Sequence, residues 1–211
     1  MGTADVFLEK IRWLGHDAFR IDAEKTIYID PYEIAGGPEG DLILVTHAHH
    51  DHCSPDDVAK IQGDASVIVT EGDAAGKLSG NIRVVKPGDT ITEQGVTIEA
   101  VPSYNTDKAF HPRENGWLGF VIEVDGVRVY HAGDTDVIPE MKDIRADIAL
   151  LPVSGTYVMT ADQAVEATLM VNPEIAVPMH YGAVAGSAAD AEAFKKGLEG
   201  KVDVRILPKS K

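Results

Sequence analysis

The sequence is short of several residue types, and each shortage excludes a class of protein. It has one cysteine, Cys53, so an internal disulfide framework is excluded. No apolar run approaches the roughly 18 residues that a membrane-spanning helix needs, and we expect no membrane partner. The first ten residues carry Asp5 and Glu9 and lack the apolar core of a signal peptide. We therefore expect a cytoplasmic protein.

Basic residues are also scarce. The chain has 19 Lys and Arg residues against 34 Asp and Glu residues, which gives a formal net charge of −15. A protein that binds nucleic acid through the phosphate backbone needs a basic face, so we expect no nucleic-acid partner. A small anionic substrate remains compatible with this charge, because bound metal cations would reverse the field locally.

The remaining composition is that of an ordinary folded chain. Its 211 residues, 44% hydrophobic and 25% charged, are enough to bury a substantial core. No repeat, low-complexity tract or long linker marks a boundary, so we expect a single domain over residues 1–211. The sequence leaves open whether the chain forms a homo-oligomer.

Branched and aromatic residues in short runs predict a strand-rich first half, and the last third alternates strands with helices. Asp125-Gly126 is a strong hairpin signal between two such runs. Two mixed sheets packed face to face, with helices outside, accommodate this order. Strands are predicted at 7–14, 18–22, 26–30, 42–46, 66–70, 90–100 as a turned pair, 121–124, 127–130, 147–153, 174–179 and 202–207, and helices at 54–62, 160–171 and 187–200.

The strongest chemical signal is the run from His47 to His52, His-Ala-His-His-Asp-His, directly after a predicted buried strand. Imidazole and carboxylate together suit zinc and neighbouring metals. Alternate side chains at a strand end point the same way. His47 and His49 are therefore expected to converge on one ion, while Asp51 and His52 turn towards a second. The alternative is a solvated loop that is rich in histidine by chance. It would not explain four ligand-type residues within six positions.

Most other histidines also lie where predicted strands end. Of eight histidines, seven lie in strand-end loops and the eighth, His111, lies in a polar loop. Loops held at strand ends by a rigid scaffold commonly carry binding groups. For His131 two interpretations stand: a hydrogen bond to a metal ligand, or a satisfied buried histidine.

These motifs resemble the metallo-β-lactamase superfamily of metal-dependent hydrolases. The His-x-His-x-Asp-His motif is complete from His47 to His52, Gly133-Asp134-Thr135 resembles the bridging aspartate, and His180 resembles the last histidine ligand. Leu14-Gly15-His16 and Ile29-Asp30-Pro31-Tyr32 are similar to the compact branch that includes ascorbate-6-phosphate lactonase-like proteins. The resemblance implies an α+β fold, a four-layer αββα sandwich of two mixed β-sheets.

The resemblance also implies two divalent metal ions, zinc first, with manganese, nickel or iron as alternatives. Asp134 would bridge them, since a carboxylate has two oxygens. The implied ligands are His47, His49 and Asp134 for the first metal, and Asp51, His52, His180 and Asp134 for the second.

One departure from the family concerns the first metal. The family usually supplies a third histidine from a strand end before the bridging aspartate, but residues 100–105 contain none. Ser103 or Asn105 takes that position, His111 reaches back from its loop, or a single metal binds. We expect His111 to enter the active site, as a ligand or a substrate contact.

The predicted activity is hydrolysis of a small ester, lactone or phosphodiester by a metal-bound hydroxide. Asp51 and His111 are the predicted catalytic residues, with Asp51 orienting the nucleophile or accepting a proton. His16, Asn105 and Lys108 are the predicted substrate contacts, and Lys108 would hold an anionic group. Two alternatives stay open: a di-iron redox enzyme on the same fold, and a metal-binding module without catalysis.

Overall fold

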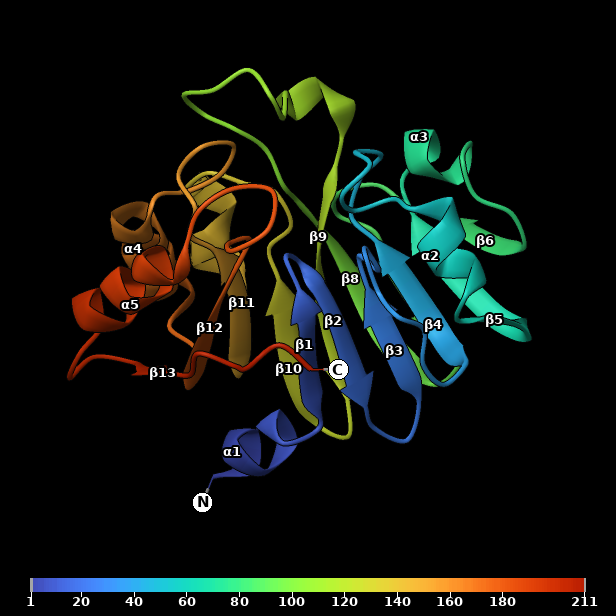
Figure 1. Cartoon of the computed structure of the whole chain (residues 1–211), viewed down its shortest axis with the longest axis horizontal. Helices are drawn as coiled ribbons and strands as arrows, with labels where there is room; N and C mark the ends of the chain where they lie inside the picture. The colour runs from blue at the N-terminus through green and yellow to red at the C-terminus, as the bar shows by residue number, and fades with distance from the viewer. Residues whose placement is uncertain (1, 211) are drawn as a thin grey trace.

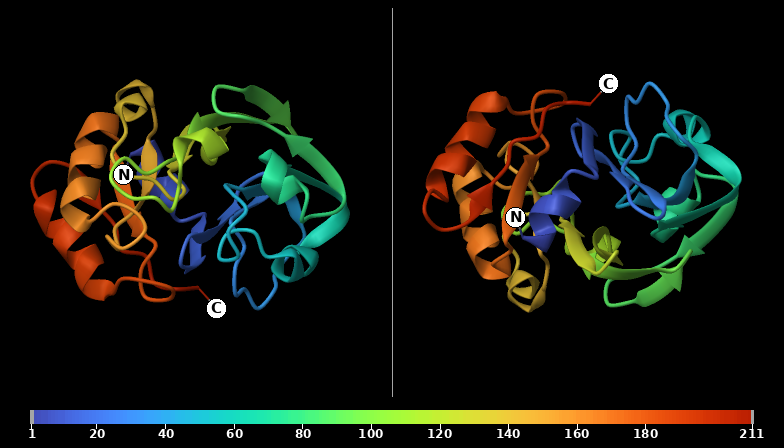
Figure 2. Two further views of the ribbon diagram at one scale, coloured as in Figure 1. Left: turned by 90° about the horizontal axis from the view of Figure 1, so that it is seen from above. Right: turned by 90° about the horizontal axis from the view of Figure 1, so that it is seen from below.

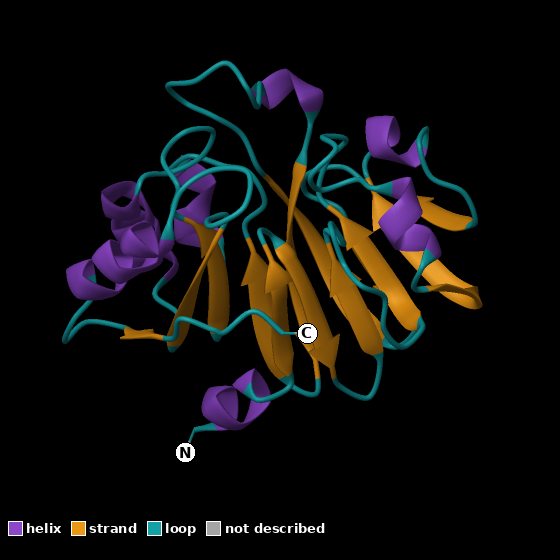
Figure 3. Ribbon diagram, viewed as in Figure 1, coloured by secondary structure: helices purple, strands orange, loops and turns teal. Residues whose placement is uncertain are grey.

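The computed structural model describes residues 2–210, which form two mixed β-sheets packed face to face (Figures 1 and 3). The first sheet has the order β1-β2-β3-β4-β5-β6 and the second the order β13-β12-β11-β10-β9-β8-β7. The strands are β1 Ile11–Gly15, β2 Ala18–Asp22, β3 Thr26–Ile29, β4 Gly40–Val45, β5 Gln62–Thr70, β6 Asn81–Val84, β7 Thr90–Glu93, β8 Val96–Pro102, β9 Leu118–Val124, β10 Val127–His131, β11 Ile148–Pro152, β12 Ile175–Met179 and β13 Asp203–Val204.

Helices cover the outer faces of both sheets, as Figure 2 shows from above and below. Helices α4 and α5 lie against the second sheet, and α2 and α3 lie on the side of the first. This is the predicted four-layer αββα sandwich. The helices are α1 Thr3–Leu8, α2 Pro55–Ala59, α3 Gly72–Ala75, α4 Ala161–Val171 and α5 Ala188–Gly197, with 3-10 turns at Arg113–Asn115 and Pro139–Asp143.

Strand β4 shows why the first sheet is buried on both faces. Leu42 and Leu44 join the large apolar cluster between the sheets. Ile43 and Val45 join a smaller cluster that includes Val58 of α2. Because side chains alternate along a strand, one continuous apolar run packs against two layers at once.

The predicted start of the first strand is wrong. Residues 3–8 form helix α1, and β1 begins only at Ile11. Ala4, Phe7 and Leu8 are the buried residues of α1, and their spacing of three and four places them on one helical face. The apolar residues of this segment are therefore buried on one face of a short helix, not in a strand.

Other element boundaries also differ from the prediction. The helix capped by Ser54 ends at Ala59, not near residue 62, because Gln62 already pairs with β4. The last strand shrinks to Asp203–Val204, since it pairs with only two residues of β12. Strand β6 was not predicted. It is an edge strand with little buried surface, so it lacks an apolar pattern.

The ends of several strands meet at one edge of the sandwich. Loops after β1, β3, β4, β8, β10, β11 and β12 all gather there, on the upper side in Figure 1. This arrangement brings every predicted metal-binding segment together from positions far apart in the sequence. Within residues 2–210, no helix has both the length and the apolar character needed to cross a membrane.

Candidate metal centre

A group of three histidines lies at the end of β4. Ligand atoms of His47, His49 and His111 all lie within 4.8 Å of one another. His47 Nε2 is 3.0 Å from His49 Nδ1, and both rings pack against Trp117, at centroid distances of 4.7 and 4.6 Å. The structure thus brings His111 to the place left vacant by the missing third histidine. Its role as a ligand stays a prediction.

The loop that carries His111 is fixed by buried polar contacts. Asn105 Oδ1 accepts hydrogen bonds from the His111 backbone and ring Nδ1, both at 3.0 Å. Asn105 Nδ2 donates to the Tyr157 carbonyl at 2.9 Å. At the base of the loop, Lys108 Nζ lies 2.5 Å from a carboxylate oxygen of the fully buried Asp136. The two predicted substrate contacts Asn105 and Lys108 therefore act here as supports of the His111 loop.

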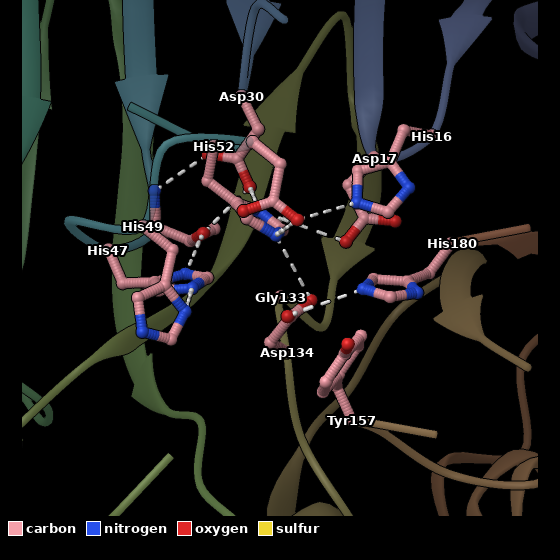
Figure 4. A network of polar contacts seen from close by, with 12 residues as sticks. His16, Asp17, Asp30, His47, His49, His52, Gly133, Asp134, Tyr157 and His180 are labelled. Atoms are coloured by element: carbon pink, nitrogen blue, oxygen red, sulfur yellow. Dashed lines mark hydrogen bonds and ion pairs between the residues drawn. The ribbon is translucent and has the colours of Figure 1, made fainter. Parts of the chain in front are cut away.

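Asp134 lies between the histidines, and its role as a bridging ligand stays a prediction. Its Oδ1 is 3.3 Å from His52 Nε2, and its Oδ2 is 3.4 Å from His180 Nε2 (Figure 4). The same Oδ2 is 3.1 Å from His111 Nε2. Two ligands on one tetrahedral zinc, with bonds of about 2.0–2.1 Å, are themselves about 3.3 Å apart.

The same atoms are left without hydrogen bonds. His52 Nε2, His111 Nε2, His180 Nε2 and Asp134 Oδ1 are buried and have no hydrogen-bond partner among residues 2–210, although each nitrogen lies within ion-pair distance of Asp134. Buried polar atoms of native proteins are normally paired with protein, water or an ion. The three histidine nitrogens converge on the two carboxylate oxygens of Asp134, at separations that suit shared coordination, so these residues fit a metal centre.

A second group forms on the other side of Asp134. Ligand atoms of His16, Asp51, His52 and His180 lie within 4.8 Å of one another. His16 Nε2 is 3.2 Å from Asp51 Oδ2, so this predicted substrate contact is buried against a predicted ligand. His180 is held from behind by Ser154 Oγ, 2.8 Å from its Nδ1.

Asp30 contacts the candidate ligand His52, and the sequence analysis predicted no role for it. Its Oδ2 lies 2.7 Å from His52 Nδ1 and accepts the Thr46 hydroxyl at 2.7 Å, while its Oδ1 accepts the Thr46 backbone N–H. Thr46 Oγ1 in turn lies 3.0 Å from His47 Nδ1. A carboxylate behind a histidine orients the ring and leaves Nε2 free for a metal. An aspartate directly after a buried strand is the signal that could have indicated this role.

The pKa values of the site depend on the charges of neighbouring groups. Burial alone would lower the pKa values of His52 and His180, but the Asp134 carboxylate outweighs it and raises the first well above its usual value and the second to about 9, so a bound metal ion would displace a proton from each ring. Burial holds the pKa of His47 well below its usual range, and the neighbouring His52 adds to this effect. Burial alone would raise the pKa of Asp134, but His180 and His52 outweigh it and hold that pKa well below the ordinary value. A neutral imidazole and an ionised carboxylate are the forms that ligate metal ions.

A small cavity opens over these groups. It has a volume of about 230 Å³, and Asp134 is one of its lining residues. His16, Asn105 and Lys108 are absent from its lining as the structure describes it, so their substrate contacts stay predictions. The cavity is lined by His49, His50, Asp51, Phe110, His111, Asp134, Tyr157 and Val184.

His131 and Cys53 are both buried, and their contacts indicate structural roles. His131 Nε2 lies 2.9 Å from the Asp17 carbonyl, and His131 Nδ1 accepts the Gly133 backbone N–H at 3.2 Å. His131 is therefore a satisfied buried histidine that fixes two turns of the site. Cys53 is buried in the apolar cluster below α2, and burial raises the pKa of its thiol to about 11.

The fold and the paired histidine groups define a metal-binding protein of the metallo-β-lactamase type. Residues 10–180 match the family model of the beta-lactamase superfamily domain, and the chain belongs to the metallo-β-lactamase superfamily. It is 39% identical to the UPF0173 metal-dependent hydrolase of Thermococcus onnurineus, over 94% of this chain and 96% of that protein.

Solved structures agree with this assignment. Igni18, a metallo hydrolase from Ignicoccus hospitalis, superposes with a TM-score of 0.78 at 27% identity and covers 95% of each chain. CmlA, a diiron β-hydroxylase from Streptomyces venezuelae, superposes with a TM-score of 0.72 at 14% identity, over 93% of this chain and 52% of that one. At that identity the likeness to CmlA shows the fold alone.

Proposed function

We propose that this protein hydrolyses a small, uncharged ester or lactone at a centre of two divalent metal ions. The first ion would be held by His47, His49, His111 and Asp134, and the second by Asp51, His52, His180 and Asp134. When bound, such ions lower the pKa of water towards neutrality and polarise the bond to be cleaved.

One observation carries this proposal: His111 and Asp134, which both have buried ligand atoms without a hydrogen bond, line the 230 Å³ cavity, and Asp134 also lies within ion-pair distance of His52 and His180. A metal site that only stabilised the fold would be closed on all sides. Here the ligand-type residues His49, Asp51, His111 and Asp134 also line the cavity, so a small molecule in it would reach the metals. This favours catalysis over a metal-binding module.

Asp51 is suited to position the attacking water. It lines the cavity, and its Oδ2 is held by His16. Burial alone would raise the pKa of Asp51, but the hydrogen bond from His16 and the charge of His52 keep it below the ordinary value. Asp51 therefore stays ionised and fixed in orientation, which suits a group that positions the attacking water better than one that accepts its proton.

The apolar residues at the mouth of the cavity favour an uncharged substrate. Phe110 and Val184 are 50% and 39% exposed there, and the Phe110 and Tyr157 rings meet edge to face at 4.8 Å. No lysine or arginine is among the described lining residues, and Lys108 is already paired with Asp136. An alkyl or aryl group fits this apolar mouth better than a phosphate or carboxylate does.

The test is a hydrolysis panel on protein loaded separately with zinc, manganese, nickel and iron, with metal content measured in the same samples. Aryl esters and lactones should be cleaved at least tenfold faster than phosphodiesters of the same aryl group. Phe110→Ala should raise KM for aryl esters with little change in kcat, whereas His111→Ala should abolish turnover. Loss of metal without loss of turnover would refute the proposal.

The di-iron redox alternative is separated by the same samples. A hydrolase keeps its activity with redox-inert zinc and consumes no oxygen. An enzyme active only with iron, and only with oxygen and a reductant, would belong to the redox class.

A further inference from the structure

The tight turn between β1 and β2 reaches into the metal centre and carries His16 and Asp17. Three hydrogen bonds fix its backbone: Trp13 Nε1 and the His180 N–H both donate to the His16 carbonyl, at 2.8 and 3.2 Å, and His131 Nε2 binds the Asp17 carbonyl. His16 and His180 both adopt a left-handed backbone, with φ of 51° and 58°. Strain of this kind persists where the surroundings enforce it, and it clusters at functional sites.

Asp17 is completely buried, with 0% of its surface exposed. Among the contacts of residues 2–210, neither of its carboxylate oxygens accepts or donates a hydrogen bond. Its Oδ2 lies 3.8 Å from His52 Nδ1. One of its oxygens also lies within 4.8 Å of ligand atoms of Asp134 and His180, as well as His52 (Figure 4).

A buried carboxylate without partners is costly, by several kcal/mol in the ionised form. A second carboxylate, Asp134, lies beside it, which increases the cost. The Asp30 carboxylate nearby shows the contrast, because three donors surround it. A cation that binds between Asp17, Asp134 and the histidines would remove this cost, and the fixed turn leaves Asp17 facing that position.

We propose that Asp17 is a further ligand of the second metal, beyond the motif residues. This rests on the proposed metal centre and adds a third carboxylate to Asp51 and Asp134. The first site is then rich in imidazole, as zinc prefers, while the second is rich in oxygen, as manganese prefers. The geometry therefore points to two chemically different sites, with Mn²⁺ favoured at the second.

The test uses the full chain, stripped of metal and titrated with Mn²⁺ and with Zn²⁺. Bound metal is counted by elemental analysis, and bound Mn²⁺ by electron paramagnetic resonance. Asp17→Asn keeps the shape and removes the charge. It should weaken Mn²⁺ binding at the second site by at least about 100-fold, because loss of an outer partner alone costs 10 to 100-fold. Zinc binding at the three-histidine site should be unchanged. Asp64→Asn, on an exposed carboxylate, is the matched control.

Anomalous-scattering maps of the unaltered protein with Mn²⁺ give a second measurement that needs no variant. An Asp17 oxygen at bonding distance from the ion is expected. An ion held by Asp51, His52 and His180 with Asp17 remote, or an Asp17→Asn variant with unaltered Mn²⁺ affinity, overturns the Asp17 assignment alone. An unaltered protein that binds no ion at Asp51, His52 and His180 overturns the proposed function instead.

Discussion

The side-chain oxygen of Asn105 lies 3.0 Å from both the backbone nitrogen and the ring Nδ1 of His111. Asn105 is near the end of β8, where the family usually has a histidine ligand. The chain thus places an amide there, and that amide holds a histidine from six residues further along. His111 Nε2 is left pointing at Asp134.

Asn105→Ala should therefore weaken metal binding at the first site by about 10 to 100-fold, as expected for a partner behind a ligand. Affinity is measured by zinc competition with a chromophoric chelator. Asn105→Asp keeps the accepting oxygen and should lose less. Equal affinities for the alanine variant and the unaltered protein would contradict the role given to this pair.

Asp30→Asn should disturb the second metal through His52. Three donors surround the Asp30 carboxylate, so an amide NH2 group in its place must face at least one of them. We expect a destabilisation of about 1–3 kcal/mol from the mismatched donor, together with weaker binding of one metal equivalent. Urea unfolding and metal stoichiometry measure the two effects. A stable variant that binds two metals normally would show that His52 is oriented by other groups.

Gly133→Ala should displace Asp134. Gly133 has φ of 63°, and an added Cβ would lie 2.6 Å from the Leu118 carbonyl oxygen. The turn must then shift, and we expect at least a tenfold loss of kcat. The matched control is Gly126→Ala in the β9–β10 hairpin, where φ is also positive, at 73°, but nothing lies within 4 Å of the added atom. That variant should lose about 1 kcal/mol of stability and keep its activity; equal activity losses would contradict the steric argument.

Asp57 provides a test of stability against pH. Burial alone would raise its pKa, but hydrogen bonds from Lys60, Ser54 and the Glu33 backbone hold the pKa below its ordinary value of 3.8. A lowered pKa stabilises the fold above the ordinary value, and the gain is lost as the pH falls through the folded-state value. Asp57→Asn should thus cost about 1–2 kcal/mol at pH 7 and progressively less below pH 4. Chemical denaturation at pH 7, 4 and 3 measures this, and a constant difference would contradict it.

Several elements could be predicted because their signals are local. The Asp125-Gly126 hairpin forms with both residues at positive φ, as its sequence favours. The α4 capping box of Thr160 and Gln163 is also present. By contrast, Phe7 and Leu8 were predicted to begin a strand but end helix α1, because the burial of this helix depends on contact with the rest of the fold. Edge strand β6 buries little surface, so it leaves no periodic pattern to detect.

By itself, the sequence determined most of the strands and helices and the ligand-type residues at strand ends, since alternation, turn residues and the His47–His52 motif are short-range patterns. The sandwich itself was implied by the family resemblance of these motifs. Only the tertiary structure decided which other side chains contact these residues. It brought His111 to His47 and His49, paired Lys108 with Asp136, set Asp30 behind His52, and buried Asp17 beside Asp134. These contacts join loops distant in the sequence, and their geometry depends on the packing of two sheets, which no local pattern encodes.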